Sequence, residues 1–242
     1  MIIVEHLFFD YAGKRALNDV SFTIEPQTIT ALVGRNGAGK TTLLRCLVAL
    51  QESTSGQITI EDEGQKYTVE DEPRKIHELC SYVSDFFGLY EELTVRQCLS
   101  YIAWSKKCPA HEVDNKIEIA AKRLDLTNYL DIKAFKLSRG LRQRLAIAQS
   151  IILEPKILFL DEPASGLDPE ARYHLSQLLV ELQKQGMTIL VSSHILTELE
   201  DYCTHMLVID QGQILDHRAL DLESENSKSM QSIYLELIQR NT

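Results

Sequence analysis

The sequence is short of paired cysteines and of long apolar runs, and each shortage narrows the class of protein. Five cysteines are spread along 242 residues without a Cys-x-x-Cys pair, which indicates neither a disulfide framework nor a zinc site. No stretch reaches the about 18 apolar residues that a membrane span needs, and the opening MIIVEHLFFDY lacks the basic flank of a signal peptide. We expect a chain that neither crosses a membrane nor is secreted, with its cysteines buried as small apolar side chains.

Basic residues are also fewer than acidic residues. The chain has 25 Lys and Arg against 35 Asp and Glu, a formal net charge of -10. Because binding along a nucleic-acid backbone requires a basic surface, we expect no nucleic-acid partner. The contents of 44% hydrophobic and 25% charged residues are ordinary for a globular protein, and 242 residues are enough for one large α/β domain. Any anionic ligand must therefore be held by local donors.

The segment GRNGAGKTT, residues 34–42, carries the strongest signal. It fits the phosphate-binding loop, in which Gly and four residues precede Gly-Lys-Ser/Thr. The apolar TITALV before it predicts a buried strand, and LLRCLVAL after it predicts a packed helix. A chance glycine-rich turn would lack this context. The predicted nucleotide-binding residues are Gly34, Asn36, Gly37, Ala38, Gly39, Lys40, Thr41 and Thr42.

Each part of this loop has a chemical reason. Glycines allow backbone N–H groups to surround a polyphosphate at close range. Lys40 supplies a positive charge to the β- and γ-phosphates, and the Thr41 hydroxyl is a ligand for Mg²⁺. The start of the following helix adds its dipole.

A second signal is PKILFLDEP, residues 155–163, where an apolar strand ends in two carboxylates. Such a strand delivers both side chains to the carboxyl edge of a sheet, where doubly wound folds bind ligands. Asp161 is placed to hold Mg²⁺ through water, and Glu162 to accept a proton from an attacking water. An acidic turn would explain the pair if it stood alone, but the phosphate loop favours the catalytic interpretation.

The remaining pattern divides the chain into layers. Alternating segments at residues 2–11, 17–24 and 56–60 predict strands, with a turn at 12–14, and suggest an antiparallel layer. Between about 73 and 138 the apolar spacing becomes helical, which predicts a helical insert. Its two predicted apolar faces contain Val95, Leu99, Ile102 and Ala103 on one side and Ile117, Ala120, Ala121 and Leu124 on the other.

Further motifs make the chain resemble the nucleotide-binding subunit of an ATP-binding-cassette (ABC) transporter over almost its whole length. The family signature LSGGQ-x-Q-R, which opens a helix, stands here as LSRGLRQR at residues 137–144. The family's SGLD segment is present at 165–168, and its histidine after the next apolar strand is His194 in TILVSSH. The departures Arg139 and Leu141 leave Ser138 and Gly140 of the signature in place.

The resemblance implies an α/β fold: a RecA-like P-loop core with a mainly parallel sheet, an antiparallel β subdomain and an inserted α-helical subdomain. Residues 1–242 would form a single ABC ATPase domain. The core and β layer would comprise about 1–72 and 141–222, the helical subdomain about 73–140 and a C-terminal helical tail about 229–242.

The resemblance also implies how the site works, with ATP and Mg²⁺ as cofactors. Ser138, Gly140 and Asp168 would act across a dimer of cassettes, the first two on the ATP held by the other subunit. His194 would contact the γ-phosphate and order the attacking water beside Glu162. Tyr11 is the candidate for stacking on adenine, although a lone turn tyrosine is as often a packing residue.

The largest departure is at the family's glutamine loop. The segment YVSDFFGLYEELTV puts Asp85 where the glutamine normally contacts Mg²⁺ and the attacking water. An aspartate offers an oxygen to Mg²⁺, but its negative charge near the γ-phosphate is unfavourable unless the metal screens it. Weakened or retuned hydrolysis is therefore expected, and a regulatory cassette that hardly hydrolyses ATP remains an alternative.

The resemblance finally implies partners and a location. An integral membrane permease would dock near residues 85–90, and the second cassette would be another copy or a related chain, at the cytoplasmic face of the inner membrane. The tail SMQSIYLELIQR is similar to that of single-cassette exporters, which favours export; a generic helix closing the core is nearly as good an explanation. A soluble ABC ATPase acting on ribosomes or DNA is disfavoured by the acidic surface.

Overall fold

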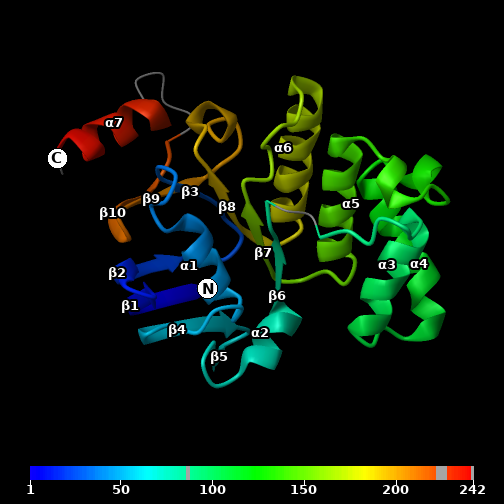
Figure 1. The fold of residues 1–242 in the computed structure, drawn as a ribbon, viewed down its shortest axis with the longest axis horizontal. Helices are drawn as coiled ribbons and strands as arrows, with labels where there is room; N and C mark the ends of the chain where they lie inside the picture. Colours follow the sequence, from blue (N-terminus) through cyan, green and yellow to red (C-terminus); the bar gives the residue numbers. More distant parts are fainter. Residues whose placement is uncertain (86–87, 222–227, 241–242) are drawn as a thin grey trace.

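Two β-sheets organise the computed structural model, which describes residues 1–85, 88–221 and 228–240 (Figure 1). In the described chain, the antiparallel sheet has the order β2-β1-β4-β5. Its strands are β1 (Ile2–Tyr11), β2 (Lys14–Ile24), β4 (Ser55–Asp62) and β5 (Gln65–Thr68). The predicted strands and the turn between the first two are confirmed.

The central sheet has the order β10-β9-β3-β8-β7-β6. Its strands are β3 (Ile29–Val33), β6 (Cys80–Val83), β7 (Ile157–Asp161), β8 (Thr188–Ser193), β9 (His205–Asp210) and β10 (Gln213–Ala219). All its neighbouring pairs are parallel except β9 with β10. The predicted α/β class with a mainly parallel sheet is therefore confirmed.

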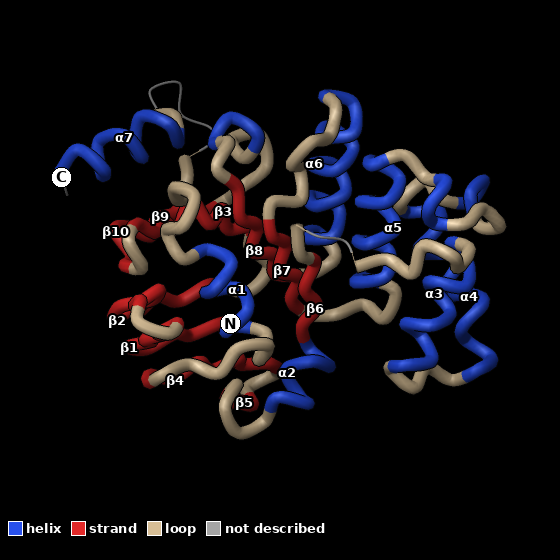
Figure 2. Tube along the Cα trace, viewed as in Figure 1, coloured by secondary structure: helices blue, strands red, loops and turns tan. Residues whose placement is uncertain are grey.

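Helix α1 lies between the two sheets, and most of the other helices lie around the central sheet (Figure 2). They are α1 (Lys40–Leu47), α2 (Pro73–Leu79), α3 (Val95–Ser105), α4 (Ala110–Arg123), α5 (Arg139–Ile151), α6 (Pro169–Lys184) and α7 (Met230–Arg240), with short 3-10 helices η1 (Thr127–Tyr129), η2 (Ala134–Lys136) and η3 (Leu196–Glu198). The helices α3, α4 and α5 pack together at the end of the molecule opposite β1 and β2 (Figure 1).

The central sheet is buried on both faces, because alternate side chains of each strand point to opposite sides. Leu158 and Leu160 of β7 join the apolar core shared with α3 to α6, whereas Phe159 between them joins the core shared with α1 and the antiparallel sheet. All five residues of β3 and of β7 are buried. The sequences of these strands are consequently almost continuous apolar runs.

Parallel pairing brings the ends of three strands together. Val33 at the end of β3 pairs with Ser193 of β8, and Asp161 at the end of β7 pairs with Ser192 of the same strand. The segments that follow these strands therefore emerge at one edge of the sheet. This edge holds the phosphate-binding loop, the acidic pair and His194.

The predicted helical range 73–140 differs from the structure at one point. Residues Cys80–Val83 form β6, which pairs with β7 as an edge strand of the central sheet. The apolar spacing of this stretch is too short to distinguish strand from helix, and pairing with β7 decides it. The two predicted apolar faces of α3 and α4 are buried as expected, with Ile102 only half-buried.

Burial of the cysteines was predicted correctly for all but one. Cys46, Cys80, Cys98 and Cys203 are buried, whereas Cys108 is partly exposed just before α4. Burial raises the pKa of the Cys46 and Cys80 thiols to about 12. These thiols are therefore neutral at physiological pH and act as apolar side chains.

The C-terminal helix α7 packs against β9 and η3. Met230 and Ile233 are buried in the core of the central sheet, but Leu235 is 50% exposed. The predicted C-terminal helix is thus present over Met230–Arg240 and packs on the core at its start, whereas Leu235 lies largely in solvent.

Gly56 in β4 permits a close approach of β1, which gives a first prediction. Its φ is +97°, and an added Cβ would lie 2.3 Å from the His6 carbonyl oxygen. Gly64, in the turn between β4 and β5, has φ +79° with open space around it. Both Gly→Ala changes strain the backbone, and we expect Gly56→Ala to lower the free energy of unfolding by about 1–3 kcal/mol more than Gly64→Ala. Urea denaturation of both variants measures this; equal losses would contradict it.

Candidate functional site

The loop between β3 and α1 has a shape that glycine alone accommodates. Gly37 and Gly39 have φ of 82° and 113°. Gly34 lies so close to β9 that an added Cβ would be 2.3 Å from the Ile209 carbonyl oxygen. In the same hairpin, the Gly212 N–H donates to the Ala38 carbonyl at 2.9 Å. The loop is therefore held by the β9–β10 hairpin.

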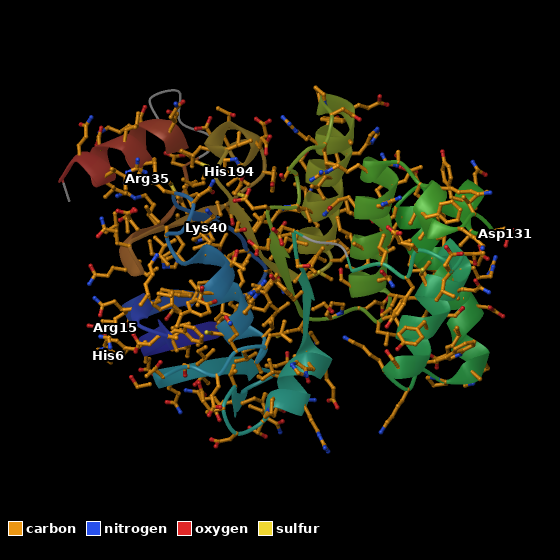
Figure 3. The ribbon with its side chains drawn as sticks, in the orientation of Figure 1. His6, Arg15, Arg35, Lys40, Asp131 and His194 are labelled. Atoms are coloured by element: carbon orange, nitrogen blue, oxygen red, sulfur yellow. The ribbon has the colours of Figure 1, made fainter. Side chains whose placement is uncertain are left out.

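Lys40 opens α1 with its side chain turned back over the loop. It is buried, and its Nζ donates to the Gly34 carbonyl at 2.7 Å. Figure 3 shows Lys40 and His194 near each other in the half of the molecule that holds the sheets, far from Asp131 at the end of the helical region. The same Nζ lies 3.6 Å from Glu162 Oε1. A cation at the start of a helix is suited to binding phosphate groups.

Glu162 contacts both Lys40 of the loop and His194, which follows β8. Its second carboxylate oxygen, Oε2, lies 2.8 Å from His194 Nδ1. Because an ionised carboxylate only accepts, Nδ1 carries the proton, and in the neutral imidazole Nε2 then remains an acceptor. Glu162 has φ of 49°, which is uncommon for a residue other than glycine. The three side chains Lys40, Glu162 and His194 thus form one connected group.

Asp161 is fixed by two hydroxyl groups. Its side chain is almost fully buried, with Ser192 Oγ donating to Oδ1 at 2.6 Å and Tyr82 OH donating to Oδ2 at 3.2 Å. Ser192 Oγ also accepts the backbone N–H of Glu162 at 3.0 Å. Neither hydroxyl was predicted from the sequence. Ser192 in TILVSSH was detectable as a polar residue ending an apolar strand, but its partner depends on the strand order.

Tyr11 contacts a threonine of the phosphate-binding loop. Tyr11 OH is 3.3 Å from Thr42 Oγ1, and its ring packs edge-on against Phe9 at 4.9 Å. The ring is 43% exposed, so one part of it is open to a ligand. Thr41 is half-buried at the first turn of α1, and Asn36 is exposed at the loop tip.

The signature residues form a second group at two helix starts. Ser138 caps α5, with Oγ accepting the Leu141 N–H, and Asp168 caps α6, with Oδ1 accepting the Ala171 N–H at 2.8 Å. Gly140, in the first turn of α5, faces Ala171. Among the described residues, no hydrogen bond or ion pair joins Ser138, Gly140 or Asp168 to the first group, Lys40, Glu162 and His194 (the Lys40 group). The structure therefore brings the predicted residues together as two groups.

Asp85 lies near the second group, in a groove that is also lined by Leu137 and Arg139 on either side of Ser138. It is exposed just after β6, and the groove of about 600 Å³ is also lined by Glu91 and Arg142. Within residues 1–85, 88–221 and 228–240 no cluster of three or more His, Cys, Asp or Glu side chains is close enough to hold a metal ion. Mg²⁺ does not require such a cluster, since it usually binds through one or two protein oxygens and retains waters. Thr41 and Asp161 are oxygen donors of that kind.

Comparison with known proteins decides the family. The family model described as ABC transporter matches residues 17–165. This chain belongs to the ABC transporter family. It is accordingly an ATP-binding and ATP-hydrolysing subunit of that family, as the order of its motifs predicted. Among its described helices, none is both long and apolar enough to cross a membrane.

Individual relatives of this ABC subunit support the same family assignment. It is 31% identical to the ABC transporter ATP-binding protein NatA of Bacillus subtilis, covering 93% of this chain and 92% of NatA. It is 33% identical to the phosphonates import ATP-binding protein PhnC of Nitratidesulfovibrio vulgaris, covering 88% and 84%. The Nod factor export ATP-binding protein I of Rhizobium johnstonii is 34% identical, covering 84% and 64%.

A solved structure confirms the fold. The ATP-binding subunit of an ABC transporter superposes with a TM-score of 0.86 at 29% identity, covering 98% of this chain and 99% of that one. The RecA-like P-loop core with its antiparallel and helical parts is thus the architecture of this ABC subunit. Relatives named for import and for export both resemble it, so the comparisons leave the direction of transport open.

Ser192 gives the second prediction. Replacing it with Ala removes a donor to the buried Asp161 and an acceptor for the Glu162 N–H. We expect the free energy of unfolding to fall by about 1–3 kcal/mol, because two buried polar groups each lose a hydrogen-bond partner. We also expect ATP hydrolysis to be slower. The control is Ser150→Ala, whose hydroxyl donates to the Ile147 carbonyl of its own helix. Thermal denaturation and phosphate release measure both effects; a Ser192→Ala protein as stable and active as the control would contradict the prediction.

Proposed function

We propose that this chain hydrolyses ATP to drive transport, with export as the direction, through a separate membrane-spanning partner. The observation that carries the proposal is the Glu162 carboxylate held between Lys40 at 3.6 Å and His194 at 2.8 Å. A base in that place accepts the proton of a water that attacks a phosphate bound beside Lys40. Export is supported by the sequence of the tail, SMQSIYLELIQR, which is similar to that of single-cassette exporters.

The reaction uses these residues in distinct roles. Backbone N–H groups of the loop and the Lys40 ammonium bind the β- and γ-phosphates. His194 keeps the Glu162 carboxylate oriented, and its Nε2 accepts from the attacking water when the imidazole is neutral, or donates to the γ-phosphate when it is protonated. Tyr11 presents the exposed part of its ring to the adenine.

Thr41 and Asp161 fit Mg²⁺ by the chemistry of their oxygens. The metal supplies charge neutralisation between the phosphate oxygens when it is bound. Ser192 and Tyr82 hold the Asp161 carboxylate in a single orientation at the edge of the sheet. The protein's contribution at this position is therefore a pre-oriented carboxylate beside the loop.

A second cassette completes the site in this proposal. Ser138, Gly140 and Asp168 lie at helix starts, where free N–H groups and the dipole favour an anion. They share no hydrogen bond or ion pair with the Lys40 group in the described chain, which agrees with a role toward the nucleotide of a second copy or a related chain. ATP would then hold two subunits together.

A surface beside β6 is proposed to receive the membrane partner. A groove of about 570 Å³ is lined by side chains that include Leu50, Tyr82, Tyr90, Tyr101 and Lys106. Leu50, Tyr90 and Tyr101 are 57%, 50% and 46% exposed, an unusual gathering of apolar side chains on the surface. Residues 86 and 87 of the expected docking segment lie outside the described residues. A partner here would place the chain at the cytoplasmic face of the membrane.

Glu162→Gln tests the hydrolysis. Removal of the base is expected to lower kcat by about 10²-fold or more, while ATP binding remains because Lys40 and the loop are intact. With hydrolysis blocked, ATP should convert the variant from monomer to dimer on size-exclusion chromatography. Lys40→Ala is the matched control, since it should lose ATP binding and the dimer together. Wild-type turnover by Glu162→Gln would overturn the assigned role.

Co-purification tests the transport function. A tagged full chain extracted from membranes in mild detergent should carry a multi-span membrane protein in fixed stoichiometry. Recovery of a purely soluble chain, or one bound to ribosomes, would contradict it. The reconstituted complex then tests the direction: in export, substrate stimulates hydrolysis from the ATP side of the membrane, and in import from the opposite side.

Asp85→Gln tests the departure in the glutamine loop. If Asp85 acts beside the γ-phosphate as expected, removing its negative charge should raise the rate of hydrolysis at saturating Mg²⁺. Because a carboxylate attracts the cation, the same change should raise the Mg²⁺ concentration at half-maximal rate. The control is Glu91→Gln, which removes a carboxylate from the same groove. If Asp85→Gln leaves both quantities at their wild-type values, Asp85 does not act on the nucleotide.

A further inference from the structure

Arg139, the first residue of α5, bonds to the turn that follows Glu162. Its Nη2 donates to the Ser165 carbonyl oxygen at 2.9 Å. The Ser165 N–H in turn donates to the Glu162 carbonyl oxygen at 3.1 Å. Two consecutive hydrogen bonds therefore join the start of the signature helix to the segment that leaves β7.

The guanidinium group of Arg139 also packs directly on Gly166. This glycine has φ +72°, and a Cβ built on it would lie 2.7 Å from Cζ and Nε of Arg139 and 3.0 Å from its Nη2. Arg139 thus occupies the space that any larger residue at position 166 would need. A planar guanidinium can lie against a backbone in this way, whereas the compact ammonium of lysine cannot.

The next residue of the helix packs on the same segment. A Cβ on Gly140 would lie 3.7 Å from Ala171 Cβ and 4.0 Å from Leu167 Cδ2, so α5 approaches the start of α6 closely. Leu167 is buried, and Asp168 beside it caps α6. The contacts of Arg139 and Gly140 therefore join the starts of α5 and α6 into one surface.

Helix stability does not account for an arginine at this position. A cation in the first turn of a helix is unfavourable, because the helix dipole is positive there. Arg139 is exposed, as are its contacts Ser165 and Gly166 and the two helix caps Ser138 and Asp168. The contact of Arg139 with residues 165 and 166 thus lies on the surface that the second cassette would meet.

We propose that Arg139 is a positioning residue for the second cassette, because it holds the helix caps Ser138 and Asp168 in fixed relative positions before the two subunits meet. The inference rests on the pairing of cassettes proposed above. Ordering a segment in advance strengthens an association, since the complex no longer loses that freedom when it forms. Without Arg139, residues 163–168 are less ordered against α5, and each association must order them.

Arg139→Met is the first test, made on the full chain in the Glu162→Gln background, where bound ATP is not consumed. We expect the protein concentration at which half of the chain is dimeric with ATP to rise about five- to tenfold. Size-exclusion chromatography over a dilution series measures it. ATP binding by the monomer should be unchanged, because the phosphate-binding loop is intact.

The control in the same background is Arg96→Met. Arg96 pairs with Glu118 at 2.9 Å on the helical subdomain, and its side chain is 38% exposed. This variant also loses an arginine and its hydrogen bond, but it should dimerise as tightly as the Glu162→Gln parent. Because Arg139 is exposed, its variants should fold, which thermal denaturation checks.

Arg139→Lys separates geometry from charge. Lysine keeps the positive charge but does not lie flat on Gly166, so this variant should dimerise nearly as weakly as Arg139→Met. If Arg139→Lys dimerises as tightly as the parent, the charge alone acts and the proposed positioning is overturned.

Hydrogen exchange tests the ordering itself in the nucleotide-free monomer. The N–H groups of Ser165 and Leu167 donate to the carbonyls of Glu162 and Ala164, each at 3.1 Å. In Arg139→Met these two amides should exchange several-fold faster than in the parent, since the turn opens more often. Unchanged exchange would show that Arg139 does not order this turn, and the inference would be wrong.

The Glu162→Gln parent distinguishes this inference from the proposed function beneath it. If ATP does not make the parent dimeric, the proposed pairing of two copies is wrong and the inference fails with it. If the parent dimerises and Arg139→Met/Glu162→Gln dimerises just as tightly, only the inference about Arg139 is overturned.

Discussion

The site depends on the parallel pairing of β3, β7 and β8. This pairing places the ends of three buried strands at one edge, so that the loop, the acidic pair and the histidine meet although they are far apart in sequence. Ser192 makes the arrangement specific, since one hydroxyl serves both Asp161 and the backbone of Glu162. Because a hydroxyl in that position is buried, any shift of β7 against β8 would leave polar groups unpaired.

Sequence patterns predicted the parts of the fold that short-range periodicity encodes. The apolar run before the loop became β3, and the run ending at Asp161 became β7. The loop residues and Glu162 lie where the motifs placed them because glycine spacing and carboxylates at a strand end have a direct structural meaning.

The features that the sequence patterns did not predict depend on contacts between residues that are distant along the chain. The edge strand β6 is too short to show a period, and its pairing with β7 creates it. Tyr82 and Ser192 reach Asp161 only through the strand order. The partial exposure of Cys108 follows from its position before α4, outside the packed face of a helix. The two groups of site residues are each internally consistent, but no pattern within one chain shows how they meet.

The contact between the phosphate-binding loop and the β9–β10 hairpin bears on the order of events during synthesis. Gly34 lies against Ile209, and Ala38 accepts from Gly212, so residues near the start of the chain take their shape from residues near its end. A nascent chain that has passed Lys40 but not Gly212 lacks this support. We therefore expect a chain that ends before Gly212 to hold nucleotide more weakly than the full chain, so that binding strengthens only late in synthesis.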